Sequence, residues 1–451
     1  MLTRLLASAA LVAVVAAPAL AQETVFPATL VGHAILPANT LIAPPADAPA
    51  SLAIAGKYTG ADRSRVAEPG TVPGMDGLRP TGLALPFEGQ PVQGFSGIAA
   101  VGDGTYWTLS DNGFGNKLNS VDTMLMLHHL GFDWDAGTVD RMATIFLSDP
   151  NFVVPFPIVN EASAERYLTG GDFDPESIQP VADGFWIGEE FGPYLVKVDL
   201  EGVVTAVIPT TVGETVVRSP DHPAINLPAN PTAALPAFNL KRSGGYEGLA
   251  LSTDGAHLYA LLEGPLYVDG AVEMVGDAPA LRIVELDVET QEWTGRSWLY
   301  PFSAGGAAIG DFNMIDENRA LVIERDNGAG GAAGACAQGA PAAADCFASP
   351  AVFKRVYIIS FGDENVGEAV AKLGYIDLMN IADPNNIRRA GGGEGFYDMP
   401  FVTIENVEIV DETHIIVGND NNLPFSAGRS VNAVDDNEFV LLEVGEFLAA
   451  R

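Results

Sequence analysis

The chain has 451 residues, of which 48% are hydrophobic and 18% are charged, so it can bury a large core and its composition does not indicate disorder. Its 23 Lys and Arg residues against 58 Asp and Glu residues give a formal net charge of -35. A chain this acidic is repelled by nucleic acid phosphates and by anionic lipid, so neither is expected as a partner.

Residues 1–21 are predicted to be a signal peptide. Arg4 supplies the basic start, residues 5–17 form the apolar region, and Ala19-Leu20-Ala21 is a small-residue cleavage motif. The apolar run is too short to span a bilayer, and no apolar stretch of about 18 residues follows it. We therefore expect an exported protein, periplasmic or extracellular, without stable membrane insertion.

A hairpin pattern recurs five times along the chain. Each copy consists of a short strand, a tight turn marked by Asp-Gly or Asp-Glu, and a β-branched or aromatic strand that ends in acids and amides. The copies open at Ser96, Glu176, Glu247, Asp311 and Glu405. Further strand-like runs follow at 124–129, 141–147, 194–198, 203–208, 281–286, 292–299, 354–360 and 371–377. Four strands per unit are typical of a propeller blade.

This pattern predicts an all-β fold, a β-propeller with five blades. A sixth blade is possible if residues 52–56 belong to another sheet. The last unit is short of strands; residues 439–444 supply its third, and residues 28–36 could complete it, so that N- and C-terminal strands close the ring. The expected domains are the signal peptide (1–21), an N-terminal segment that contributes the closing strand (22–94) and the propeller (95–447).

The repeated positions carry acids. In a closed ring of similar units, equivalent residues gather at one rim of the central channel, and the opening residue is acidic in every copy except the first, which has Ser96. So many carboxylates would repel one another unless a cation were bound. Asp, Glu and Asn oxygens suit Ca²⁺, and too few histidines or thiolates accompany them for zinc or copper. The alternative is that these acids solvate a polar rim or cap turns.

The motifs, in order, resemble the phytase-like family described by "esterase-like activity of phytase". The likeness covers roughly residues 94–445 and rests on Gly94-Phe-Ser-Gly-Ile with Leu109-Ser-Asp-Asn-Gly, Phe173-Asp-Pro-Glu-Ser-Ile with Gly188-Glu-Glu, Gly245-Tyr-Glu-Gly-Leu-Ala with Leu262-Glu-Gly, Ile323-Glu-Arg, and Ile404-Glu-Asn with Asn419-Asp-Asn-Asn. The resemblance implies a secreted bacterial β-propeller, related to calcium-dependent phytases, that hydrolyses phosphate or other esters. Ser96 departs from the acidic pattern of the other repeats.

These residues suggest a metal-dependent ester hydrolase, most simply one that acts on phosphoric monoesters through metal-activated water. The expected metal ligands are Asp111, Glu176, Glu247, Glu263, Glu324 and Asp420. Glu190 and Glu247 are the candidates for general-base work, Arg325 for catalysis and anion binding, and Lys117 and Asn112 for further substrate contacts. For Arg325 a salt bridge to Glu324 or Asp326 is an equally open interpretation.

Cys336 and Cys346 lie in a Gly, Ala and Pro loop and are expected to form a disulfide, because export leads to an oxidising compartment. The expected partner is a small anionic or ester substrate, and the expected state is a monomer. Two other functions remain open: a propeller that binds a ligand or partner without catalysis, and a calcium-dependent lactonase or carboxylesterase.

Overall fold

The computed structural model describes residues 23–67, 70–230, 232 and 237–451, so the predicted signal peptide lies outside the described residues. In this part of the chain the fold is all-β. The helical content is one short α-helix, α1 (Gly445–Leu448), and the 3-10 turns η1 (Ala50–Ala53), η2 (Ala332–Gly334) and η3 (Asp363–Asn365). No helix among the described residues is long and apolar enough to span a membrane.

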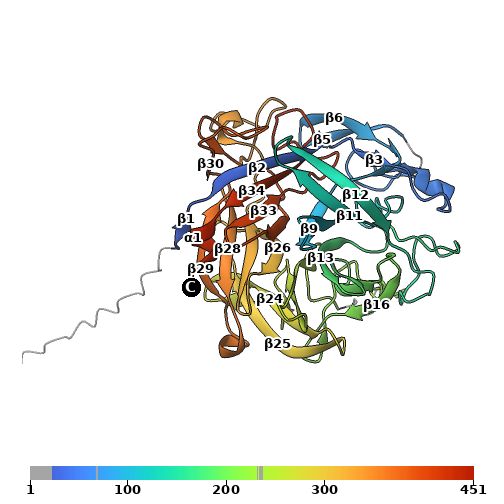
Figure 1. The fold of residues 1–451 in the computed structure, drawn as a ribbon. Helices are drawn as coiled ribbons and strands as arrows, with labels where there is room; N and C mark the ends of the chain where they lie inside the picture. Colours follow the sequence, from blue (N-terminus) through green and yellow to red (C-terminus); the bar gives the residue numbers. More distant parts are fainter. Residues whose placement is uncertain (1–22, 68–69, 231, 233–236) are drawn as a thin grey trace, which may run out of the picture.

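Antiparallel sheets stand around a common centre, in a propeller-like arrangement (Figure 1). The first contains β9 (Phe95–Ala100), β10 (Tyr106–Ser110), β11 (Met126–Asp133) and β12 (Thr138–Phe146). The second contains β13 (Pro175–Val181), β14 (Gly184–Glu189), β15 (Tyr194–Val198) and β16 (Val204–Pro209). The third contains β19 (Tyr246–Leu251), β20 (His257–Leu262), β24 (Ala278–Asp287) and β25 (Glu292–Pro301), with β23 (Met274–Val275) paired to β24.

The remaining sheets include strands from the N-terminal segment. One contains β26 (Ala308–Met314), β27 (Arg319–Arg325), β28 (Lys354–Ser360) and β29 (Ala371–Asp377), with β1 (Val25–Phe26) added in parallel at its outer edge. The other contains β32 (Asn406–Ile409), β33 (His414–Gly418), β34 (Asn437–Glu443) and β2 (Thr29–Leu36). Because β2 pairs antiparallel with β34, the N-terminal run completes the sheet of the C-terminal strands, as expected for residues 28–36.

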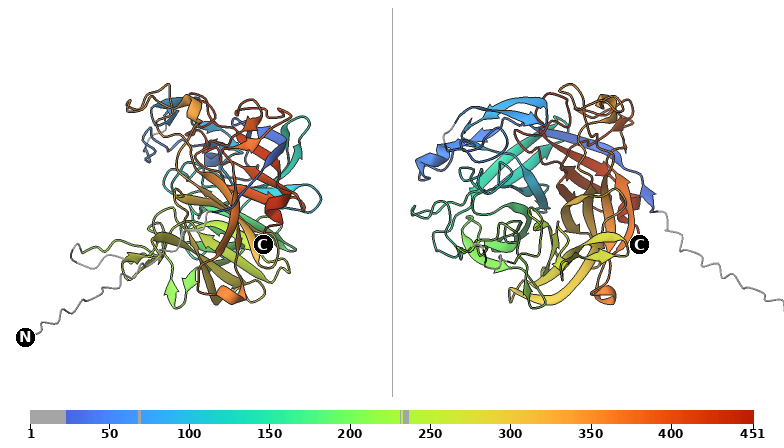
Figure 2. Two further views of the ribbon diagram at one scale, coloured as in Figure 1. Left: turned by 90° about the vertical axis from the view of Figure 1, so that its left-hand side faces the viewer. Right: turned by 180° about the vertical axis from the view of Figure 1, so that it is seen from behind.

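The ring of sheets is closed at its centre and tied at its periphery. The innermost strands β9, β13, β19, β26 and β32 contact one another in cyclic order, with β32 returning to β9. At the outside a single parallel pair joins Ile35 of β2 to Thr138 of β12, so the first and last sheets are continuous. The view from behind shows the same closed arrangement (Figure 2).

Several short pairs of strands accompany the ring of sheets. They are β3 (Leu41–Ile42) with β8 (Gln90–Pro91), β4 (Ile54–Ala55) with β7 (Phe87–Glu88), β5 (Val72–Asp76) with β6 (Arg79–Leu85), β17 (Thr211–Val212) with β18 (Thr215–Val216), β21 (Tyr267–Val268) with β22 (Ala271–Val272), and β30 (Ile381–Ala382) with β31 (Phe396–Tyr397). Residues 52–56, the candidate start of a sixth blade, therefore contribute only a two-stranded pair.

Apolar side chains fill the spaces between neighbouring sheets. Trp186 of β14 is fully buried in one apolar cluster with Leu249 of β19, and Trp107 of β10 meets Phe185 edge-on with ring centroids 4.9 Å apart. This packing accounts for the β-branched and aromatic runs of the repeats, because each sheet is covered on both faces by its neighbours.

The central channel is plugged by polar side chains. Asp311 accepts the backbone N–H groups of β9 and β32, and Asn313 donates its amide to carbonyls of the same two strands. Gln179 of β13 donates to Asn313 and to a carbonyl of β19. All the innermost strands are thus cross-linked, and Asp311, which opens the fourth hairpin, is committed to this plug.

The predicted disulfide between Cys336 and Cys346 is present. It closes a loop that projects between the fourth and last sheets, at the same end of the ring as the acidic hairpin termini. Both cysteines of the chain are used in it.

Candidate functional site

Two of the acids that face the centre stand on β-bulges. The pairing of β13 with β14 shifts register between Pro175 and Ser177, which makes Glu176 the extra residue. The pairing of β19 with β20 shifts between Tyr246 and Gly248, so Glu247 is the extra residue there. A bulge re-aims the side chain that it carries, and here it directs both carboxylates into the mouth of the ring.

The second strand of each hairpin brings another acid to the same level. Glu190 and Glu263 follow directly after β14 and β20, and Asp111 follows after β10. Each of these residues donates its backbone N–H to the carbonyl of the residue just before the first strand of its hairpin. The N···O distance is 3.0 Å for Glu190 and 2.7 Å for Glu263. The start and the end of each hairpin therefore lie side by side at one rim.

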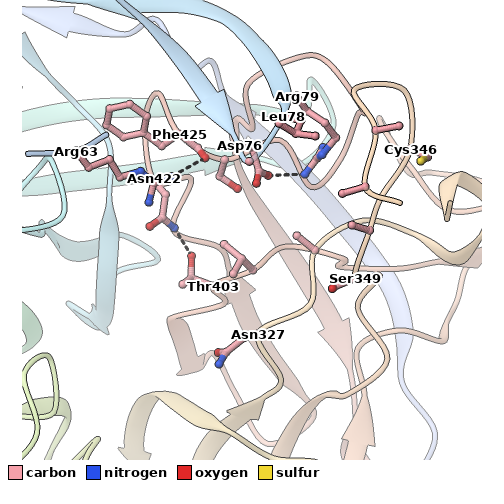
Figure 3. A pocket seen from close by; sticks show the side chains of 17 residues that line it. Arg63, Asp76, Leu78, Arg79, Asn327, Cys346, Ser349, Thr403, Asn422 and Phe425 are labelled. Carbon is pink, nitrogen blue, oxygen red and sulfur yellow. Dashed lines mark hydrogen bonds and ion pairs between the residues drawn. The ribbon is translucent and has the colours of Figure 1, made fainter. Parts of the chain in front are cut away.

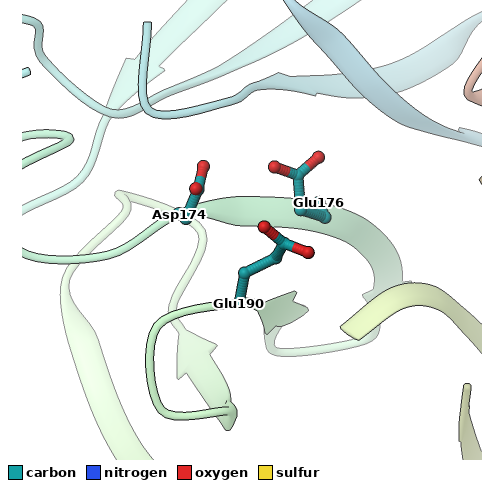
Figure 4. Close-up of side chains that lie close together, drawn as sticks. All are labelled: Asp174, Glu176 and Glu190. Carbon is teal, nitrogen blue, oxygen red and sulfur yellow. The ribbon is translucent and has the colours of Figure 1, made fainter. Parts of the chain in front are cut away.

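The carboxylates converge in two overlapping groups. Asp174, Glu176 and Glu190 form the first, shown in Figure 4, and Glu176, Glu247 and Glu405 form the second. In each group the ligand oxygens lie within 4.8 Å of one another, and every member is buried. Glu176 belongs to both groups, so we call their union, together with Asp111, Glu263 and Asp420 nearby, the acidic mouth.

Burial and mutual repulsion disfavour ionisation in the acidic mouth. Burial first, and then the neighbouring carboxylates, raise the pKa values of Glu176, Glu190 and Glu247 well above the usual range. Burial together with Asp420, Asp174 and Glu405 raises the pKa of Asp111, and burial together with Glu405 raises the pKa of Asp420. These carboxyl groups therefore keep their protons to a higher pH than exposed carboxyl groups do.

Two positively charged side chains, Arg325 and Lys241, form ion pairs with carboxylates of the acidic mouth. The Arg325 guanidinium lies 3.0 Å from Glu405 Oε1 and 4.0 Å from Glu247 Oε1. Lys241 Nζ lies 2.7 Å from Glu263 Oε2. The pairing open from the sequence, Arg325 with Glu324 or Asp326, does not occur in the structure, since neighbouring residues of a strand point to opposite faces.

Glu324 is not brought into the acidic mouth. Its carboxylate accepts hydrogen bonds from Tyr300 Oη at 2.6 Å, from the Ser303 backbone N–H at 2.7 Å and from Lys372 Nζ at 2.5 Å. These partners lie on β25, on the loop that follows it and on β29, and they surround a fully buried carboxylate. The Glu324 carboxylate is therefore occupied by the ion pair with Lys372 and by these hydrogen bonds, outside the acidic mouth. The expected ligands Glu176 and Glu247 lie within the mouth.

Asn112 and Lys117 lie on the loop after β10. Asn112 donates its backbone N–H to Asp174 Oδ1 at 3.0 Å and its side-chain amide to Asp174 Oδ2, so it orients an acid of the mouth. Lys117 lies over the rings of Phe156 and Phe191, at 5.8 and 5.5 Å from their centroids. No carboxylate of the described residues forms an ion pair with Lys117, which leaves its ammonium available to an anion.

The structure adds Asp174 and Glu405 to the candidates. Glu405 occupies the repeat position of Glu176 and Glu247, so the periodicity itself marks it. Asp174 lies two residues before Glu176, and its pKa is raised to about 6, mainly by burial. Ser96, the exception in the repeat, is buried beside Glu405, with 3.4 Å between Ser96 Oγ and Glu405 Oε2.

The donor set suits a hard cation. All the ligand atoms in the two groups are carboxylate oxygens, and the groups contain no histidine or cysteine. Oxygens bound to one Ca²⁺ at about 2.3–2.6 Å lie no more than roughly 5 Å apart, which agrees with the spacing in both groups. The residues therefore fit calcium better than a transition metal.

The fold and this mouth define an all-β ring of sheets with a rim of converging acids. The family described as "Phytase-like: Esterase-like activity of phytase" matches residues 90–423, so the chain belongs to the phytase-like family. The resemblance inferred from the motifs is confirmed, and family membership supports a hydrolase of the esterase type.

Other relatives are more distant. An uncharacterized secreted protein from Arthroderma benhamiae is 27% identical over 182 residues, which cover 36% of this chain and 35% of that protein. A luciferin-regenerating enzyme matches with a TM-score of 0.33 and 10% identity over 78% of this chain and 93% of its own. The Dos1 propeller matches with a TM-score of 0.29 and 10% identity over 80% and 70%. Likenesses this weak carry no argument about function.

Proposed function

We propose that this protein is an exported, calcium-dependent ester hydrolase whose preferred substrates are phosphoric monoesters. The observation that carries the proposal is the sharing of Glu176 between two groups of buried carboxylates. So concentrated a negative charge would repel an anionic ester, and bound calcium would reverse that sign at the place where the ester must lie.

When bound, calcium would supply positive charge for the ester oxygens and lower the pKa of a coordinated water. Asp174, Glu176, Glu247 and Glu405 are the proposed ligands, with Asp111, Glu263 and Asp420 completing the mouth. Asn112 holds Asp174 in orientation through two hydrogen bonds.

Glu190, a member of the first group of carboxylates, would accept the proton of the attacking water. Its pKa is raised by burial and by Glu263 and Asp174, which makes it a stronger proton acceptor than an exposed carboxylate. Arg325 holds Glu247 and Glu405 and leaves donors for an anionic oxygen. Lys117, without a carboxylate partner among the described residues, attracts the anion from the side of the first sheet.

The wider organisation forms part of the same proposal. We interpret the ring as five blades, closed by β2 on β34, within a propeller domain of residues 95–447 that acts as a monomer. Export is supported by the disulfide and by the relation to a secreted protein. The choice between periplasm and extracellular space is left to fractionation.

Turnover assays on p-nitrophenyl phosphate and p-nitrophenyl acetate, with calcium or with EGTA, test the proposal. We expect hydrolysis of the phosphate ester that EGTA abolishes and calcium restores. Glu190→Gln should lower turnover while Glu201→Gln, an exposed acid on a turn, should not. Hydrolysis of the acetate alone would favour a lactonase or carboxylesterase. A folded, calcium-binding protein without turnover on either ester would favour a binding propeller.

A further inference from the structure

A cavity of about 430 Å³, shown in Figure 3, is lined in part by residues that contact Asp420 of the acidic mouth. It is enclosed by the N-terminal segment around Arg63 and Arg79, by the disulfide loop, and by the loops that carry Thr403 and Asn422. Arg63 and Arg79 precede residue 90, where the match to the phytase-like family begins. This wall of the cavity therefore lies outside the region that the family match covers.

The cavity and the acidic mouth share a wall. Asn422 donates its backbone N–H to Asp420 Oδ1 at 2.7 Å, and Thr403 Oγ1 donates to the Asp420 carbonyl at 3.1 Å. Asn327 accepts a hydrogen bond from Arg325 Nη1 at 3.3 Å. A molecule whose ester lies at the mouth would thus reach into the cavity with the rest of its structure.

The Arg63 guanidinium lines this cavity without an ion pair, and Asp76, which also lines it, acts on its charge from beyond ion-pair distance. The guanidinium lies over the Phe425 ring, 4.7 Å from the centroid, and donates one hydrogen bond, to the Phe425 carbonyl. No carboxylate of the described residues forms an ion pair with it, whereas Arg79 on the same wall pairs with Asp76. Because a guanidinium has five N–H donors, most of those on Arg63 remain free.

The backbone at Arg63 is held in a strained conformation by the loop that serves the mouth. Its φ of 57° lies in the left-handed region, which is unfavourable for a residue with a Cβ. The side-chain amides of Asn119 and Asn116 both donate to the Arg63 carbonyl, at 2.5 and 3.2 Å. The same loop carries Asn112, which orients Asp174. Strained backbone conformations that neighbouring residues hold in place are common at ligand-binding sites.

We propose that Arg63 and this cavity form an anion subsite, which takes a second anionic group of the substrate, a phosphate or a carboxylate, while the reacting ester lies at the acidic mouth. The fork of a guanidinium matches two oxygens of either group. The role of the subsite in a substrate complex rests on the proposed function. Anion binding at Arg63 does not, because it needs neither calcium nor turnover.

Modification by phenylglyoxal tests the subsite in the full chain. Arg65 is a control within the same sample: it lies two residues away, donates to the Leu118 carbonyl and covers the Tyr58 ring, outside the cavity. In EGTA, inorganic phosphate should slow the modification of Arg63 and leave that of Arg65 unchanged, as read by peptide mass spectrometry. An acetate arm distinguishes the two anions: protection by phosphate alone identifies a phosphate subsite, and protection by both identifies a general anion subsite.

Calorimetry on variants gives a second measurement. Arg63→Gln should weaken phosphate binding in EGTA about tenfold, the loss expected for one charge-assisted contact, while Arg65→Gln should bind as the wild type does. Equal modification of Arg63 with and without both anions, or unchanged affinity in Arg63→Gln, would overturn the subsite. If the protein hydrolyses neither ester while phosphate still protects Arg63 from phenylglyoxal, the proposed function alone is rejected.

Discussion

Glu176 and Glu247 each occupy the extra position of a β-bulge, in two different sheets, and their carboxylate oxygens lie within 4.8 Å of each other. A regular strand would alternate its side chains between the two faces of its sheet. In β13 and β19 the bulge instead turns one acid toward the axis. The same local irregularity in two strands of the ring brings together residues that are far apart in sequence.

Glu176 is expected to matter more for calcium than any single neighbour, because both carboxylate groups contain it. Glu176→Gln should weaken calcium binding by about tenfold or more. Loss of a residue that only orients a metal ligand already lowers metal affinity by about tenfold, and Glu176 is itself a proposed ligand. Glu190→Gln changes one of the two groups only and should have the smaller effect. Calcium titration by calorimetry checks the order; equal affinities for Glu176→Gln and the wild type would show that the mouth does not bind the ion.

Calcium should stabilise the protein more at pH 8 than at pH 5. The carboxyl pKa values of the mouth are raised in the folded state, to about 6 for Asp174 and well above the usual range for Glu176 and Glu247, against about 4 in the unfolded chain. The folded state therefore holds more protons between these values, so the stability of the metal-free protein falls as the pH rises through them. Bound calcium offsets this loss.

Thermal unfolding in EGTA and in calcium, at both pH values, measures the effect. The EGTA sample should lose stability as the pH increases, and the difference between the two samples should widen. A calcium-induced shift of the melting temperature that is the same at pH 5 and pH 8 would contradict the assignment.

Lys372 should be important for stability and not for calcium. It is the charged partner of the fully buried Glu324, so Lys372→Met would strand that carboxylate between the third and fourth sheets. Breaking a buried pair in this way costs about 3–5 kcal/mol in the free energy of unfolding. Urea denaturation should show this loss, with calcium stoichiometry unchanged. A calcium defect without a stability defect would return Glu324 to the metal ligands.

Asn313 should hold the innermost strands together. Asn313→Ala removes the donor to carbonyls of β9 and β32 and leaves Gln179 without one acceptor, at about 1–3 kcal/mol for each stranded buried group. We expect a lower urea midpoint in calcium and in EGTA alike, since the plug lies below the ligands. Wild-type stability in Asn313→Ala would mean that water replaces the amide.

The amino-acid pattern predicted the strands closely where alternation and turn residues are local features. The run 194–198 became β15 and the run 354–360 became β28 with those bounds, and residues 28–36 pair with the C-terminal strand β34. The repeat marks Glu405 as the opening residue of its hairpin, but only the structure shows that its carboxylate lies beside those of Glu176 and Glu247. Side-chain direction at bulges and strand ends has no local signature.

The sequence by itself determined the all-β class, the repeated hairpins, the disulfide and the acids that recur at hairpin ends, because each depends on spacing over a few residues. The tertiary structure decided which acids meet. It turned Glu324 toward Lys372 and its neighbour Arg325 toward Glu405, and it placed Arg63 beside a cavity formed by loops hundreds of residues away. Such contacts follow from how the ring closes, and closure depends on the packing of all the sheets at once.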